Sequence, residues 1–151
     1  MYRSAGIVRP IEILVVEDNP ADVRLIIEGL KSTDMTHHVH TAADGEQAIH
    51  FVHQQGEYRL APRPDLILLD LNLPGKSGHE VLAAIKTDPR TRRIPVIVLS
   101  SSKDRRDVEK VYDLNANSYI QKPTDLDSMF EMLRSVELFW LNWAVLPVPA
   151  V

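Results

Sequence analysis

Short apolar runs alternate with helical patterns along the chain, and this alternation limits the fold more than any other feature of the sequence. Residues 11–16 (IEILVV), 65–70 (DLILLD) and 94–102 (IPVIVLSSS) are short and rich in aliphatic side chains. Runs of this length and composition are typical of strands that are buried on both faces. Pro95 stands at the start of the third run, where a missing backbone N–H does little harm.

Two weaker strands and five helices complete the pattern. Residues 37–45 (HHVHTAADG) predict a strand that ends in a turn, and residues 117–123 (NSYIQKP) predict a short fifth strand. Helical patterns follow the five runs, beginning at Pro20 and continuing at residues 47–55, 78–88, 104–114 and from Asp125 onward. Five strands that alternate with five helices within one domain length predict a parallel sheet with helices on both faces.

The first helix has clear start signals. Asn19 is a favoured N-cap, Pro20 suits the first helical position, and Asp22 places negative charge in the first turn. Apolar residues recur at helical spacing at Val23, Ile26, Ile27 and Leu30. This spacing predicts that all four side chains face the core.

Length, charge and cysteine content exclude several classes of protein. A chain of 151 residues has the size of one domain, and its net charge of −4 gives no general attraction to nucleic acid or anionic lipid. The basic stretches at residues 90–95 and 103–107 are expected to be a solvated loop and a solvated helix start. The chain has no cysteine, which excludes disulfides and thiolate catalysis. No stretch resembles a signal peptide or a membrane span, so we expect a cytoplasmic protein with no nucleic-acid or membrane partner.

Polar side chains stand at the ends of four of the predicted strands. Glu17 and Asp18 follow the first strand, and Asp70 ends the third. Ser100 ends the fourth strand, and Lys122 ends the fifth. The carboxyl ends of parallel strands share one edge of the sheet, where ligands bind in folds of this kind. These five residues are therefore expected to form one site.

The residue types at this edge suit metal-assisted phosphoryl transfer. Neighbouring carboxylates repel one another unless a cation lies among them, and an all-oxygen site with access to water suits Mg²⁺. Asp70, which follows a run of leucines, is a candidate nucleophile that would form an aspartyl phosphate. Ser100 is a candidate hydrogen-bond donor to a phosphoryl oxygen, and Lys122 supplies a positive charge for another.

Four motifs in this order resemble the receiver domain of two-component response regulators. They are VVEDNP (15–20), LLDLNLPGKSG (68–78), IVLSSS (97–102) and SYIQKP (118–123), and the resemblance covers residues 12–139. It implies a flavodoxin-like, doubly wound (βα)5 α/β fold with a five-stranded parallel sheet in the order 2-1-3-4-5. It also implies transfer of a phosphoryl group from the phosphohistidine of a sensor histidine kinase to Asp70.

The resemblance assigns metal-binding roles to four residues. Asp18 matches the direct magnesium ligand, and Glu17 matches the acid that acts through water. The phospho-acceptor Asp70 also contributes to the metal site, and Asn72 matches the position whose backbone carbonyl completes it. The cofactor implied is Mg²⁺.

The resemblance also assigns the groups that sense the phosphoryl group. Lys122 matches the phosphate-binding lysine, with a cis peptide bond to Pro123 expected. Ser100 and Tyr119 match the switch hydroxyl and the switch aromatic residue. The family mechanism implies that both move on phosphorylation and change the surface of the fourth helix, fifth strand and fifth helix.

The C-terminal part of the chain suggests how output is delivered. We expect a flexible N-terminus at residues 1–10, a receiver domain at 11–140 and an apolar tail at 141–151, with no further domain to carry output. The fifth helix and the tail are apolar on more than one side, which predicts a homodimer or partner face. The residues assigned to this face are Met132, Val136, Phe139, Trp140 and Trp143.

The tail also indicates a subgroup of the family. The ending LFWL…W…LP, together with residues 71–88 and 94–102, resembles regulators that pair with bacterial and cyanobacterial phytochrome histidine kinases. This resemblance implies a phytochrome kinase as partner and dimerisation through the C-terminal end. The alternative that the tail folds back over its own domain remains open.

Two other functions are alternatives to that of a phosphorylated receiver. A haloacid-dehalogenase-like phosphatase needs a second aspartate two residues after its nucleophile, where this chain has Asn72, so turnover of an external substrate is not expected. A constitutive binding module of receiver fold, with output independent of phosphate, remains an alternative. The histidine pairs His38/His40 and His50/His53 lack an evident third ligand and are expected to be surface residues.

Overall fold

The computed structural model describes residues 9–31 and 37–147, and its centre is a parallel sheet in the order β2-β1-β3-β4-β5. The strands are β1 (Ile11–Val16), β2 (His37–Ala42), β3 (Leu66–Leu69), β4 (Val96–Ser100) and β5 (Ser118–Gln121). All four neighbouring pairs are parallel. The predicted fold class and strand order are confirmed.

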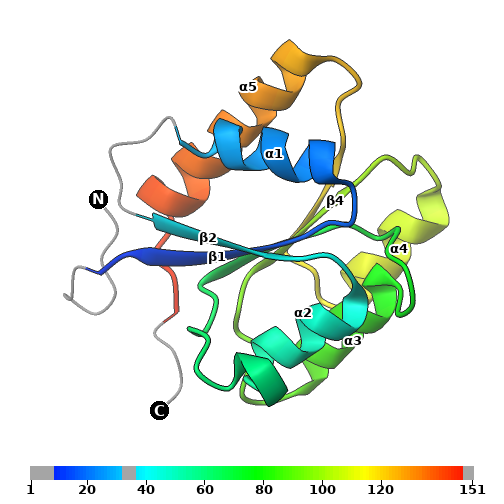
Figure 1. The fold of residues 1–151 in the computed structure, drawn as a ribbon. Helices are drawn as coiled ribbons and strands as arrows, with labels where there is room; N and C mark the ends of the chain where they lie inside the picture. The colour runs from blue at the N-terminus through cyan, green and yellow to red at the C-terminus, as the bar shows by residue number, and fades with distance from the viewer. Residues whose placement is uncertain (1–8, 32–36, 148–151) are drawn as a thin grey trace.

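Helices cover both faces of the sheet, with α1 and α5 on one side and α2, α3 and α4 on the other (Figure 1). The helices are α1 (Pro20–Gly29), α2 (Gly45–Val52), α3 (Gly78–Thr87), α4 (Arg105–Asp113) and α5 (Leu126–Glu137), with one-turn helices η1 (Gly56–Tyr58) and η2 (Leu138–Trp143). Among the described residues, no helix has the length and apolar composition needed to cross a membrane.

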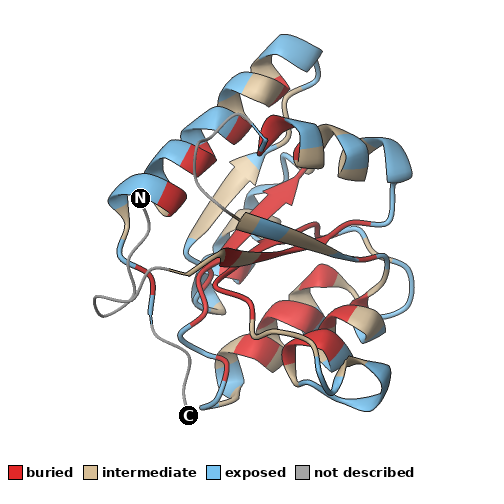
Figure 2. Cartoon of the chain, turned by 60° about the vertical axis from the view of Figure 1, so that its left-hand side comes forward, coloured by how far each residue is buried: buried red, intermediate tan, exposed pale blue. Residues whose placement is uncertain are grey.

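Side chains that alternate along the strands fill two separate cores. Leu14, Val16 and Ile67 pack with α2, α3 and α4, whereas Ile13 and Val15 pack with α1 and α5. The central strands are buried along their length, while β2 and β5 at the two edges are only partly buried (Figure 2). This explains why the central strands gave the strongest apolar runs and the edge strands the weakest.

The predicted second helix, residues 47–55, was displaced along the chain. Helix α2 begins at Gly45 because the side chain of Asp44 accepts a hydrogen bond from the backbone N–H of Gln47. It ends before Gln54, whose φ of 55° lies in the left-handed region. The capping side chain and the left-handed residue therefore set the ends of the helix, which apolar periodicity did not locate.

Part of the predicted tail packs against the domain. Leu141 and Leu146 are 0% and 2% exposed, and they lie in the same core as α1 and α5. Val136 is also buried there. The sequence assigned it to an exposed dimer or partner face, and its burial corrects that assignment. Residues 1–8 and 148–151 of the predicted end segments lie outside the described residues. The boundaries proposed at residues 10 and 140 stay predictions.

An ion pair ties the residues before β1 to the sheet. Both carboxylate oxygens of Asp65 accept hydrogen bonds from the guanidinium of Arg9, one of them at 2.7 Å. The backbone N–H of Glu12 donates to the same carboxylate at 2.8 Å. Asp65 itself is 3% exposed, so its negative charge depends on these donors.

We expect Asp65→Ala to destabilise the protein by about 2–4 kcal/mol, because the change leaves the Arg9 guanidinium and a backbone N–H without their acceptor. Urea unfolding followed by circular dichroism measures the difference. The control is Glu28→Ala, which removes an exposed ion pair with Lys31 and should cost less than about 1 kcal/mol. Equal stability losses for the two variants would contradict the prediction.

Candidate functional site

Three carboxylates meet at the carboxyl edge of the sheet. Glu17 and Asp18 follow β1 and Asp70 follows β3, and these two strands are neighbours in the sheet. Each residue places a carboxylate oxygen within 4.8 Å of the others. Within residues 9–31 and 37–147, this is the one such group that could hold a metal ion. Glu17 and Asp70 are buried, whereas Asp18 is exposed.

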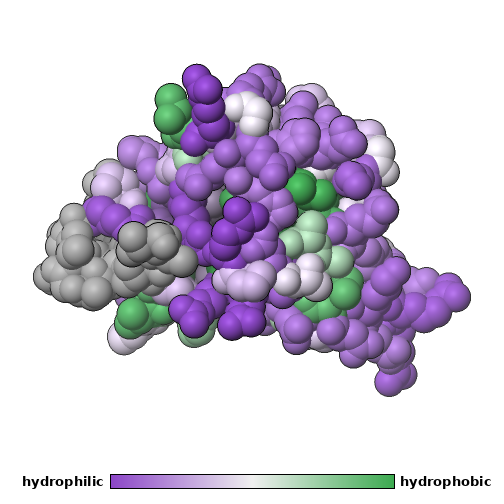
Figure 3. All heavy atoms as spheres, turned by 90° about the horizontal axis from the view of Figure 1, so that it is seen from below, coloured by the Kyte–Doolittle hydropathy of each residue, from purple (hydrophilic) through white to green (hydrophobic). Residues whose placement is uncertain are grey.

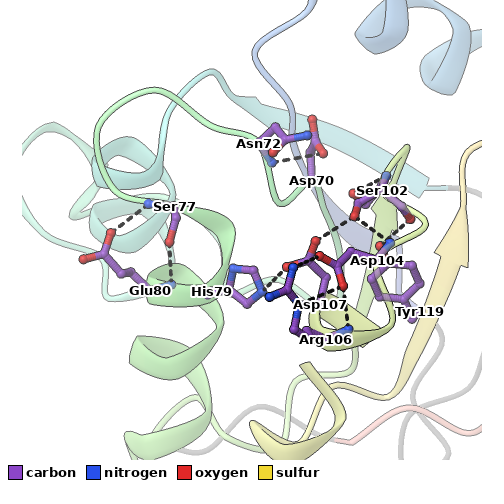
Figure 4. Close-up of polar contacts among 11 residues, drawn as sticks. Asp70, Asn72, Ser77, His79, Glu80, Ser102, Asp104, Arg106, Asp107 and Tyr119 are labelled. Carbon is purple, nitrogen blue, oxygen red and sulfur yellow. Dashed lines mark hydrogen bonds and ion pairs between the residues drawn. The ribbon is translucent and has the colours of Figure 1, made fainter. Parts of the chain in front are cut away.

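Local hydrogen bonds fix two of these acids. The backbone N–H of Asn19 donates to Glu17 Oε1 at 3.1 Å, and Asn19 in turn caps α1. The backbone N–H of Asp70 donates to the carbonyl of Val16 at 3.0 Å, so sheet pairing continues up to Asp70. The backbone N–H of Asn72 donates to Asp70 Oδ1 at 3.3 Å (Figure 4). The role of the Asn72 carbonyl as a metal ligand stays a prediction.

Lys122 places its ammonium group among the acids. Its Nζ lies 2.7 Å from Glu17 Oε2, 3.0 Å from Asp22 Oδ2 and 3.5 Å from Asp70 Oδ2. Asp22 was not predicted as a site residue, because the sequence marked it only as an acid in the first turn of α1. The available signal was its position, since the helix that follows β1 begins at the same edge of the sheet.

Burial and the close charges shift the pKa values of Glu17 and Lys122. Burial raises the pKa of Glu17 to about 7, and the charge of Asp70 adds to this rise against the opposing effect of Lys122. Burial alone would lower the pKa of Lys122, but hydrogen bonds to Glu17 and Asp22 outweigh it and raise that pKa. Negative charge exceeds positive charge in the pocket, which favours a further cation.

The donor set fits a hard divalent cation. Glu17, Asp18 and Asp70 offer only carboxylate oxygens, which are the ligands that Mg²⁺ and Mn²⁺ prefer over soft metals. The histidines do not contribute to this group: His38 Nδ1 and His40 Nε2 lie 2.9 and 2.7 Å from the carboxylate oxygens of Glu12. In the part of the chain that the structure describes, the acid pocket is therefore the site that can hold a metal.

The two predicted switch residues, Ser100 and Tyr119, are both hydrogen-bonded to Ser102 in the loop that follows β4. Ser100 is completely buried, and its Oγ accepts a hydrogen bond from the backbone N–H of Ser102 at 3.2 Å. The hydroxyl of Tyr119 donates to the backbone carbonyl of Ser102 at 2.8 Å (Figure 4). The backbone N–H of Tyr119 donates to the hydroxyl oxygen of Tyr112 on α4 at 3.1 Å.

The expected cis peptide bond between Lys122 and Pro123 is wrong. Every peptide bond of the described residues is trans. The trans form is the lower in energy for a bond to proline. In this form the backbone N–H of Lys122 still donates to the carbonyl of Ser100 at 2.8 Å. The Lys122 side chain also reaches the acids, so neither contact needs the cis form.

A shallow groove runs beside the acids between α1 and the end of β2. Its volume is about 400 Å³. Val23 and Ile27 line it, although helical spacing predicted that both would face the core. Only Ile26 and Leu30 of that predicted set are fully buried. The groove is a mainly apolar surface next to the carboxylates.

Large apolar side chains are exposed after α5. Phe139 and Trp143 are 54% and 75% exposed, and Leu138 and Val145 are exposed as well. Met132 and Trp140 are half-buried and pack on the core. Figure 3 shows the molecule from below, and on this face hydrophilic side chains predominate and hydrophobic ones form small groups. Because they are large and exposed, the apolar residues around η2 are a candidate interaction surface.

The fold and the acid pocket define a class of signalling protein. The family model described as response regulator receiver domain matches residues 13–134, and the chain belongs to this family. The chain is 49% identical over 138 residues to response regulator Rcp1 of Synechocystis sp., covering 91% of this chain and 94% of Rcp1. The resemblance predicted from the sequence motifs is confirmed.

Solved structures agree with this assignment. The phosphorylated cyanobacterial phytochrome response regulator RcpA superposes with a TM-score of 0.91 and 50% identity, over 93% of this chain and all of that one. The Mn(2+)-bound form of Rcp1 superposes with a TM-score of 0.90 and 48% identity, over 92% of this chain and all of that one. The chain is a receiver regulator related to Rcp1. Receiver domains bind a divalent metal in an acidic pocket of the kind that Glu17, Asp18 and Asp70 form here.

The raised pKa of Glu17 predicts how stability depends on pH. The folded protein binds a proton at Glu17 more tightly than the unfolded chain does, because the pKa rises from 4.5 to about 7. Stability from this group is therefore full below about pH 4.5 and declines as the pH rises through about 7. A cation that requires the ionised form should offset this decline. We expect Mg²⁺ to raise the melting temperature more at about pH 8 than at about pH 5.5.

Differential scanning fluorimetry with and without Mg²⁺ measures this effect. The Glu17→Gln variant is the control, because it cannot lose a proton at this position. In that variant the melting temperature should respond to Mg²⁺ by a similar amount at both pH values. A wild-type response that does not change with pH would contradict the prediction.

Proposed function

We propose that this regulator accepts a phosphoryl group from a partner histidine kinase onto Asp70 in a Mg²⁺-dependent step. The observation that carries the proposal is the position of Lys122, whose ammonium lies 3.5 Å from the carboxylate of Asp70. Glu17 and Asp18 lie within 4.8 Å of the same carboxylate and complete the pocket. The protein is not expected to turn over an external substrate; it hydrolyses its own aspartyl phosphate slowly.

The residues of the site have separate tasks in this reaction. A carboxylate oxygen of Asp70 forms a bond to phosphorus while the bond between phosphorus and the imidazole nitrogen of the donor breaks. The electron pair of the broken bond goes to the imidazole. A divalent cation held by Glu17, Asp18 and Asp70 would supply positive charge that offsets the charge on the transferring group. Lys122 exchanges contacts with carboxylates for contacts with phosphoryl oxygens.

The product is recognised by the switch residues. The hydroxyl of Ser100 donates a hydrogen bond to a phosphoryl oxygen, and the loop that follows β4 moves with it. Tyr119 responds because its hydroxyl is bonded to Ser102 in that loop. Phosphorylation thus favours one of two arrangements of the α4, β5 and α5 surface, by the difference in binding free energy between them.

We expect incubation with phosphoramidate and Mg²⁺ to add one phosphoryl group to the wild type and none to Asp70→Asn. The Lys122→Ala variant should react about 10²-fold more slowly than the wild type, because it lacks the positive charge beside the acceptor. Intact mass spectrometry over time measures both effects. The exposed residue Lys31 provides the matched control, since Lys31→Ala removes the same charge far from the pocket. Equal reaction of wild type and Asp70→Asn would contradict the proposal.

The proposed partner is a phytochrome histidine kinase. The similarity to the phytochrome response regulator RcpA supports it, since half of the aligned residues are identical. The groove beside the acids, between α1 and the end of β2, offers such a kinase an apolar surface next to Asp70. In the same mass assay, a phosphorylated phytochrome kinase should transfer its phosphoryl group faster than a histidine kinase of another sensory class. Equal transfer rates would argue against this partner.

We also propose that a second copy of the chain covers the apolar surface around η2. Phe139 and Trp143 are large, exposed and close in sequence, and the segment that carries them is anchored in the core by Leu141. An anchored aromatic surface is typical of protein interfaces. Size-exclusion chromatography with light scattering should give a dimer for the wild type and a monomer for Trp143→Asp.

The control for this experiment is Leu60→Asp, because Leu60 is 89% exposed but lies in another part of the sequence. It should remain a dimer. The same measurement with and without phosphorylation distinguishes a regulator whose output depends on phosphorylation from a constitutive binding module. A dimer that is equally stable in both states favours the constitutive binding module, and a monomeric wild type overturns the proposed interface.

A further inference from the structure

The switch serine has one hydrogen bond that orients it. Ser100 Oγ accepts from the backbone N–H of Ser102, and among the described residues its hydroxyl hydrogen has no acceptor. The hydroxyl is therefore held as a free donor. This is the state that can donate to a phosphoryl oxygen without first breaking another bond. The position of the Ser102 backbone determines whether this state is kept.

The side chain of Ser102 is held by α4. Its Oγ donates to Asp107 Oδ2 at 2.6 Å and accepts from the backbone N–H of Asp104 at 3.2 Å (Figure 4). The first of these is a short bond to a carboxylate, which is stronger than a bond between neutral groups. Ser102 and Asp107 are half-buried, whereas Asp104 and Glu109 near them are exposed. Asp107 thus fixes the loop that orients Ser100.

The same carboxylate also faces α3. Asp107 Oδ1 lies 3.5 Å from Nε2 of His79, which is buried without a hydrogen-bond partner. Burial lowers the pKa of His79, and the charge of Lys110 lowers it further against the effect of Asp107. Nε2 of His79 makes no hydrogen bond to Asp107, so the Ser102 hydroxyl is the side-chain group that donates to this carboxylate. The bond from Ser102 is therefore not replaced by a contact with α3.

Helix α3 begins directly against the acceptor. The backbone N–H of Gly78 donates to the carbonyl of Leu71 at 3.0 Å. A Cβ added to Gly78 would lie 2.4 Å from the carbonyl oxygen of Asp70, so this approach needs a glycine. Asp107 therefore lies between a helix that rests on the acceptor backbone and a loop that carries the switch serine.

We propose that Asp107, acting through Ser102, is a positioning residue for phosphorylation of Asp70. It holds the loop after β4 so that the hydroxyl of Ser100 stays free to donate to the phosphoryl group. This inference rests on the proposed function of Asp70. Neither Asp107 nor Ser102 touches the reacting atoms in this scheme, and both act by orienting Ser100.

Initial rates of phosphorylation by phosphoramidate at saturating Mg²⁺ test the proposal. We expect Ser102→Ala and Asp107→Ala each to lower the rate by about three- to tenfold, the effect of losing one charge-assisted hydrogen bond. The double variant should be no slower than the slower single variant, because both changes break the same bond. Ser102→Thr keeps the hydroxyl and should keep the wild-type rate. The control Glu109→Ala removes an exposed carboxylate from the same helix and should have no effect.

A second readout separates positioning from a general structural role. The dissociation constant for Mg²⁺, measured by calorimetry, should be the same in wild type and variants, because the acid pocket is not altered. If Asp107→Ala does not fold, the contrast between Ser102→Ala and Ser102→Thr carries the same test. Wild-type rates in both alanine variants, or losses that add in the double variant, would overturn the inference. A wild type that does not react in this assay would instead count against the proposed function.

Discussion

The site depends on one positive charge among several negative ones. Lys122 contacts Glu17, Asp22 and Asp70 at distances of 2.7 to 3.5 Å. Without it, buried carboxylates on adjacent strands would repel one another and favour protonation over ionisation. The strand order places β1 and β3 side by side and β5 at the edge, so that a long side chain can reach back across the sheet. The proposed chemistry at Asp70 thus depends on topology and charge together.

The backbone of the same strand links this pocket to the surface. The backbone N–H of Lys122 donates a hydrogen bond to the carbonyl of Ser100, and the hydroxyl of Tyr119 donates one to the carbonyl of Ser102 in the loop that follows. In the proposed function, these few contacts connect a change in charge at Asp70 to the α4 and β5 face. The apolar segment around η2 lies in continuity with α5 and shares its core. Acceptor, switch and candidate interface are parts of one packed unit.

The sequence predicted the central strands and the acid pocket because both depend on local rules. A buried parallel strand must be apolar throughout, and ligands bind beyond its carboxyl end. It did not predict the contact of Lys122 with Asp22, because the sequence marked Asp22 only as an acid in the first turn of α1. The burial of Leu141 was likewise not predicted, since a helix that is apolar on several sides gives no sign of which side the core takes. The start of α2 was also predicted wrongly, because the side chain of Asp44 sets it by capping the helix, and apolar periodicity does not show this.

The hydroxyl of Tyr112 has a consequence for how molecules of this protein meet. It accepts the backbone N–H of Tyr119, a donor of the edge strand β5. An open edge would allow a strand of another molecule to extend the sheet, which is a common route to aggregation. Here a side chain from α4 closes that position, although β5 is the last strand of the sheet. At that position the edge strand offers its donor to its own helix and not to a strand of another molecule.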